Sequence, residues 1–165
     1  MLDDEMLRHV FEVREVLDGL AARQATAQVT LAELAELWEH VREQQRLLDA
    51  EPDHRRDAEI DLAFHTAVRS LSGNKPLCDA LLKLDTQSHL YRSHMWSHDV
   101  TRRLAVTEHR RIVAALEAGD ADAALRADDE LHDVVVRLAD NAVLADTLEQ
   151  HSPLLRRLER ARFAA

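Results

Sequence analysis

The chain has 165 residues, of which 46% are hydrophobic, and a formal net charge of -10 at pH 7. This length suits one domain, residues 1–165, that can bury a sizeable core without disulfides. The acidic balance would repel a phosphate backbone and argues against direct nucleic-acid contact by this chain. Only three glycines and three prolines occur, which favours helices over turn-rich β structure.

Cysteine usage and hydropathy indicate a cytoplasmic protein. Cys78 is the lone cysteine, so the sequence has no disulfide framework, which suits a reducing compartment. No apolar run approaches the roughly 20 residues that a membrane-spanning helix needs. The acidic start MLDDEM also differs from the basic start of a signal peptide. We therefore expect no membrane segment.

Two helices are expected before Pro52. Apolar residues at helical spacing predict the first helix over residues 3–25. Thr30, followed three residues later by Glu33, forms a capping-box pattern. The second helix should start there and continue until Pro52 ends it.

Two more helices should follow over residues 53–72 and 76–96. Gly73 suits the left-handed conformation at a helix C terminus, and Asn74 can cap the helix after it. Pro76 would lie in the first turn of that helix, where a missing N–H costs little.

The rest of the chain is expected to form up to three helices. A polar break at residues 97–101 precedes a fifth helix that ends at Gly119, and a sixth helix should extend to Ala139. Asn141 opens a seventh helix, which can bend near Pro153. No segment alternates with period two, as strands would. The sequence therefore predicts an all-α fold, an antiparallel bundle of six to seven helices.

Acidic residues precede histidine by four positions in five places, a spacing that puts both side chains on one helix face. Chance predicts about two such pairs at this composition, so the spacing alone is a weak indication of function. A solvated contact worth a few tenths of a kcal/mol would explain any one pair. The five pairs are Glu5/His9, Glu36/His40, Asp61/His65, Asp85/His89 and Asp128/His132.

The pair Asp61/His65 differs from the others in its apolar surroundings. Phe64 and Val68 lie beside it on the same helix, so we expect His65 at the inner edge of the bundle, where an unpartnered imidazole would be costly. Helical bundles build metal sites from ligands at i and i+4 on one helix, joined by ligands from other helices. Three histidines and one carboxylate would suit Zn, Ni, Mn or Fe and would leave positions for water or a ligand oxygen.

Three sequence segments occur in a fairly specific order and spacing. They are FEVREVLDGLAARQA near the start, DLAFHTAVRSLSGN in the middle and TEHRRIVAALEAGDADAA later. Together they resemble the FCD domain, the ligand-binding half of FadR-type GntR transcription regulators. The resemblance extends from about Val10 to Asp140. It implies an FCD-like helical bundle with an effector cavity.

The resemblance also implies a set of metal ligands. In FCD domains an Asp and a His one turn apart combine with two later histidines, which by position implies Asp61, His65, His109 and His132. The interval from His109 to His132 is about one residue longer than in the usual pattern, and one residue turns a helix by about 100°. A local adjustment near Gly119 would restore the position of His132.

The start of the chain departs from the FadR-type pattern. Those regulators join a winged helix-turn-helix to the FCD domain, whereas the FCD-like sequence here begins soon after Met1. We therefore expect no DNA-binding domain in this chain. Either it is an effector domain supplied as a fragment, or it is a stand-alone protein that keeps the pocket without the DNA reader.

The expected ligand is a small organic acid. An open divalent ion attracts carboxylate oxygens, and an arginine can hold a second carboxylate. The resemblance implies that Arg14 and Arg92 lie near the cavity, and Tyr91 and Trp96 could line it. Exposure of the arginines on an amphipathic face, and packing of the aromatic rings in a core or interface, are the alternatives.

His89, His94 and His98 form a second candidate cluster. A metal could bridge His94 and His98, which are four residues apart. This segment nears a helix end and lacks an apolar frame, so contacts that support the main site are the alternative.

Three classes of function agree with these features. We favour an effector-sensing domain, in which the acid binds the metal, shifts the helix packing and passes this shift to a DNA-binding module. The alternative is a stand-alone FCD-fold metalloenzyme acting on a small carboxylate-bearing substrate, although no catalytic motif is visible. The third is a helical dimerisation module whose Asp–His pairs are structural. The resemblance also implies a homodimer, with the first and fourth helices as contributors.

Overall fold

This computed structural model describes residues 4–127, except for the side chains of Asp4, Leu7 and residues 89–94. The described residues form six helices and no strand. The fold is therefore all-α, as the sequence predicts. None of the described helices is long and apolar enough to cross a bilayer. The helices are α1 (Asp4–Ala25), α2 (Leu31–Asp49), α3 (His54–Leu71), α4 (Lys75–Met95), α5 (Asp99–Ala118) and α6 (Ala121–Arg126).

The first five predicted helices are confirmed to within a few residues, except at the start of α5. This helix begins at Asp99, so the break before it is shorter than the predicted 97–101. The Asp99 carboxylate suits the positive end of the helix dipole and accepts a hydrogen bond from Arg103 Nε at 2.8 Å. The predicted sixth helix begins as α6, while its course beyond Ala127 and the whole seventh helix lie outside the described residues.

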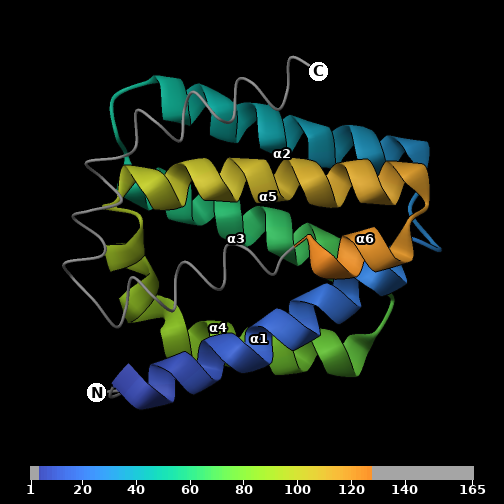
Figure 1. Ribbon diagram of the computed structural model, residues 1–165, viewed down its shortest axis with the longest axis horizontal. Helices are drawn as coiled ribbons and strands as arrows, with labels where there is room; N and C mark the ends of the chain where they lie inside the picture. Colours follow the sequence, from blue (N-terminus) through green and yellow to red (C-terminus); the bar gives the residue numbers. More distant parts are fainter. Residues whose placement is uncertain (1–3, 128–165) are drawn as a thin grey trace.

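Successive helices run in opposite directions, as expected for an antiparallel bundle (Figure 1). The helices α2, α3 and α5 lie together in the upper half of that view, and α1 and α4 lie together below them. The two halves meet where α1 and α4 pack against α3, and α6 packs against both α1 and α5. Helix α3 therefore contacts α2 and α5 in one half and α1 and α4 in the other.

Local hydrogen bonds start two of the helices where the sequence predicts. At the start of α2, the Thr30 N–H donates to Glu33 Oε2 at 2.8 Å, and the Glu33 N–H donates to Thr30 Oγ1 at 3.3 Å. At the start of α4, the Leu77 N–H donates to Asn74 Oδ1 at 3.1 Å. Gly73, just before it, has a φ of 65°, which glycine adopts without steric cost.

The main hydrophobic core lies between α1, α2, α3, α5 and α6, with Phe64 fully buried within it. Its members are the apolar residues that recur at helical spacing, and their burial supplies the main driving force for folding. A smaller cluster holds Trp96 against Phe11 and Ala105, so Trp96 packs in the core. The main cluster comprises Ala22, Ala25, Leu34, Leu37, Val41, Phe64, Val68, Ile112, Val113, Ala115, Leu116, Ala124 and Ala127.

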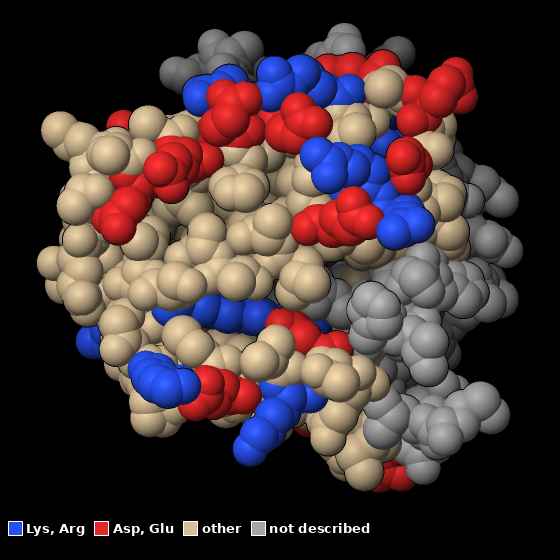
Figure 2. All heavy atoms as spheres, turned by 180° about the vertical axis from the view of Figure 1, so that it is seen from behind, with Lys and Arg blue, Asp and Glu red and all other residues tan. Residues whose placement is uncertain are grey.

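The described surface carries interspersed acidic and basic side chains (Figure 2). On α2, for example, Arg46 contacts Glu39 at 2.5 Å and Glu43 at 2.9 Å. On the face drawn in Figure 2, the described Lys and Arg residues lie mostly next to Asp and Glu rather than in one broad basic area.

Candidate metal centre

Asp61 and His65 lie one turn apart on the inward face of α3. Asp61 is 3% exposed and His65 is 6% exposed, and the fully buried Phe64 lies between them in sequence. Their spacing places both side chains on the same face of the helix. The Asp61 Oδ1 to His65 Nε2 distance is 3.6 Å.

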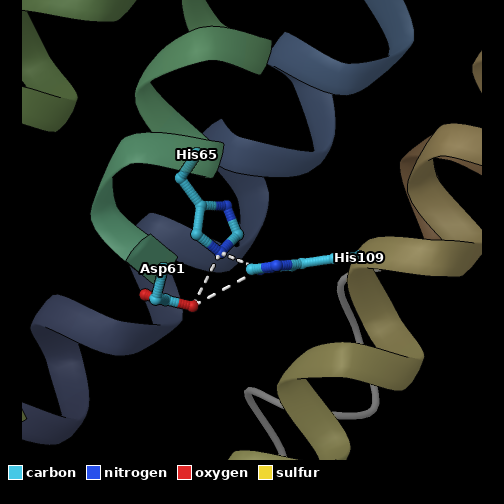
Figure 3. A group of neighbouring side chains, drawn as sticks. All are labelled: Asp61, His65 and His109. Carbon is cyan, nitrogen blue, oxygen red and sulfur yellow. Dashed lines mark hydrogen bonds and ion pairs between the residues drawn. The ribbon is translucent and has the colours of Figure 1, made fainter. Parts of the chain in front are cut away.

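His109 reaches the same point from α5 (Figure 3). It is fully buried, and its Nε2 lies 3.2 Å from His65 Nε2 and 3.3 Å from Asp61 Oδ1. One ligand atom from each of these three residues lies within 4.8 Å of the other two. The fold therefore brings together side chains that are 44 positions apart in the sequence, His65 and His109.

Gln44 fixes the orientation of His109 from the opposite side of the ring. Its Oε1 lies 2.6 Å from His109 Nδ1, and both side chains are buried. An amide oxygen only accepts, so Nδ1 carries a proton, and in the neutral ring Nε2 presents its lone pair toward Asp61 and His65. Histidines that bind metals usually donate their other ring N–H in this way.

Sequence reasoning missed Gln44, although a signal for it exists. It continues the buried stripe of Leu34, Leu37 and Val41 at helical spacing along α2. A polar residue on such a stripe needs a buried partner.

Phe64 supports the other side of the centre. Its ring stacks on the His109 ring with 3.8 Å between centroids and an angle of 14° between planes. The His65 ring meets the His109 ring nearly at a right angle, 82°. Close packing of this kind restricts both imidazoles to few orientations.

The donor set fits a divalent ion. Ligand atoms about 2.1 Å from a tetrahedral or octahedral ion lie about 3.0–3.4 Å from one another, which is close to the distances between these nitrogen and oxygen atoms. The two imidazole Nε2 atoms lie 3.2 Å apart, and a proton or a cation must lie between them because their lone pairs would otherwise repel each other. Two histidines and a carboxylate are ligands that Zn, Ni, Mn and Fe accept.

The structure describes no side chain for three other predicted site residues. His132, the predicted fourth metal ligand, lies beyond the described residues, and the side chains of Tyr91 and Arg92 belong to the undescribed stretch of α4. In the alternative cluster, the side chains of His89 and His94 are likewise undescribed, while His98 is the N-cap residue of α5.

Arg14, the other arginine implied near the cavity, lies in a buried ion network. Its Nη2 is 3.2 Å from Asp85 Oδ1 and 3.8 Å from Asp18 Oδ2. Arg69 donates to Asp18 Oδ1 at 2.7 Å and also to Asp85 Oδ2. The network joins α1, α3 and α4 one turn beyond His65 on α3.

Arg69 stays charged in this network. Burial lowers the pKa of its guanidinium, but the charges and hydrogen bonds of Asp18 and Asp85 outweigh burial and raise that pKa above its ordinary value. No sequence pattern identifies this network. Its members are spread over three helices and only the fold brings them together.

Similarity to known proteins shows the family of this chain. The structure is similar to that of E. coli McbR/YncC, with a TM-score of 0.76 and 18% identity over 84% of this chain and 70% of that chain. No protein with a curated description matches this chain. The sequence pattern of the FCD domain matches residues 9–127, which include Asp61, His65 and His109. The chain therefore belongs to the FCD domain family.

Proposed function

We propose that this chain is the effector-sensing domain of a GntR/FadR-type transcription regulator and that it binds a divalent metal ion and a small organic acid. The observation that carries the proposal is the convergence of Asp61 Oδ1, His65 Nε2 and His109 Nε2 at a buried point of an FCD fold. Burial of these polar groups costs free energy, which a bound cation would offset.

The proposed metal ligands are Asp61, His65, His109 and, from the undescribed part of the chain, His132. When bound, the ion supplies a positive centre that attracts carboxylate or hydroxyl oxygens. Gln44 and Phe64 orient His109 for this purpose. The donor types allow Zn, Ni, Mn or Fe.

The proposed effector is a small organic acid, because a divalent ion with open coordination positions binds carboxylate oxygens. We assign Arg92 to the cavity, as the resemblance implies, and Tyr91 to its lining. The guanidinium of Arg14 already contacts Asp85 and Asp18. We therefore expect Arg14 to affect the affinity for the acid indirectly, through this network. A direct contact would require the acid to displace one of the two carboxylates.

The same network offers a route for the signal. Asp61 and His65 lie on α3, and one turn further Arg69 contacts Asp18 on α1 and Asp85 on α4. A shift of α3 when the acid binds would therefore move α1 and α4 as well. We propose that residues 1–165 form one domain and act in the cytoplasm on an attached or partner DNA-binding module.

We also propose that the chain forms a homodimer through α1 and α4. Large apolar side chains are exposed on both helices, including Val13 (48%) and Val16 (67%) on α1 and Leu82 (65%) on α4. In a dimer these side chains would be buried as one apolar patch, the kind of surface that favours a protein interface. Light scattering should give twice the chain mass for the wild type and the single mass for Val16→Asp with Leu82→Asp; a monomeric wild type would overturn this point.

The first experiment is elemental analysis of protein purified without a His tag. We expect about one divalent ion per chain in the wild type and loss of that ion in His65→Ala and His109→Ala. His54→Ala, an exposed histidine at the start of α3, is the matched control and should keep the metal. A wild type that takes up no Zn, Ni, Mn or Fe would overturn the proposal.

The second experiment separates a sensor from an enzyme. An organic acid that binds the metal-loaded protein should raise its thermal midpoint by mass action. Recovery of the acid after prolonged incubation, measured by NMR, should show it unchanged. Conversion of the acid that stops in Asp61→Asn would favour the metalloenzyme instead.

A further inference from the structure

Glu108 is a buried carboxylate beside the proposed metal ligands, and the sequence reasoning did not single it out. It precedes His109 on α5 and is 3% exposed. Its Oε1 lies 3.8 Å from His65 Nε2, and Asp61 Oδ1 lies 3.6 Å from the same nitrogen. Two carboxylates thus lie close to one imidazole nitrogen.

Glu108 occupies the inward-facing stripe of α5. Thr101, Ala105 and Ile112 lie seven residues before, three before and four after it, and all three are buried. A core-facing stripe usually carries uncharged residues, because a buried carboxylate loses its hydration. A positive charge nearby would stabilise an ionised carboxylate at this position.

We infer that Glu108 belongs to the metal centre as a positioning residue whose negative charge helps to hold the ion; this inference rests on the proposed function. Ionised Asp61 and Glu108 together with neutral imidazoles bring two negative charges to the centre, which a divalent cation balances. The mutually close ligand atoms come from Asp61, His65 and His109. Glu108 is not among these ligands, so it acts through its negative charge and through its position beside His65.

The test compares Glu108→Gln with the wild type. The substitution removes the charge and keeps the shape, and Glu117→Gln removes the same charge from an exposed position of α5 as a matched control. Competition against a chromogenic chelator gives the Kd for Zn and for Mn. We expect Glu108→Gln to bind both ions about 10- to 100-fold more weakly, and the control to bind them as the wild type does.

Thermal unfolding of the metal-free protein supplies a second readout. Two nearby carboxylates repel each other without the ion, so Glu108→Gln should raise the midpoint of the metal-free protein and reduce the rise that metal produces. A purely structural glutamate would lower the metal-free midpoint and leave metal affinity unchanged. Should Glu108→Gln fail to fold, Glu108→Met, of similar length and uncharged, gives the same comparison.

The outcomes separate this inference from the proposed function. A wild type that binds neither Zn nor Mn overturns both. A wild type that binds metal, with Glu108→Gln binding it equally well, overturns only the role of Glu108. Weaker binding in Glu108→Gln together with a raised metal-free midpoint supports the inference.

Discussion

The imidazole Nδ1 of His109 on α5 lies 2.6 Å from Oε1 of Gln44 on α2, and neither residue is exposed beyond 5%. This hydrogen bond connects two helices and leaves His109 Nε2 as the nitrogen that faces Asp61 and His65. The tautomer of a ligand histidine is thus set by a residue that would not itself touch the ion.

Replacement of Gln44 should therefore weaken metal binding without removing a ligand. We expect Gln44→Ala to lower metal affinity about 10- to 100-fold, whereas Gln44→Glu, which keeps an acceptor oxygen, should retain it. Chelator competition measures both. Gln45→Ala, at the next position of α2, is the control, and equal affinities in Gln44→Ala and this control would contradict the assignment.

Arg69 should be the most sensitive member of the buried ion network. Arg69→Met leaves the Asp18 and Asp85 carboxylates buried with Arg14 as their remaining cation in the network, so the free energy of unfolding should fall by about 3–5 kcal/mol. Urea unfolding followed by circular dichroism measures this change. Arg46→Met, which removes a solvent-exposed arginine from ion pairs on α2, should cost less than about 1 kcal/mol. Similar losses in the two variants would refute the importance of the network.

Phe64 should contribute both to stability and to the order of the metal centre. It is fully buried and stacks on His109, so Phe64→Ala should lower the free energy of unfolding by about 3–5 kcal/mol. Phe64→Leu should cost less but should still broaden the His109 resonances in NMR spectra. Leu62→Ala, at a 36% exposed position of the same helix, is the control. An unchanged His109 signal in Phe64→Leu would argue against the stacking role.

The capping box of α2 gives a prediction for acidic pH. Hydrogen bonds from the Thr30 backbone N–H and then from the Thr30 hydroxyl lower the pKa of Glu33 below its ordinary value of 4.5. The unfolded chain therefore binds this proton more readily, so the stabilisation is complete above pH 4.5 and is lost as pH falls through the lowered pKa. Carboxyl titration by NMR should show a midpoint below 4.5 for Glu33, and Thr30→Ala should move it upward. A Glu33 midpoint at or above 4.5 would exclude the effect.

The sequence by itself determined the helical class and most helix boundaries. Caps such as Thr30 with Glu33, and Asn74, act within a few residues, so their patterns can be read without the fold. The i, i+4 spacing of Asp61 and His65 likewise placed them on one face of a helix. His109 was predicted as a metal ligand only from the resemblance to the FCD domain, and the structure places it beside Asp61 and His65.

Only the tertiary structure decided which side chains from different helices meet. Gln44 and His109 are 65 positions apart, and Arg69 and Asp18 are 51 apart, so no local pattern relates them. Their contacts depend on how the helices cross and how far each is shifted along its axis, which apolar spacing leaves open. For the same physical reason Glu108 reads as an ordinary acidic residue of α5 until the packing of α3 against α5 places His65 beside it.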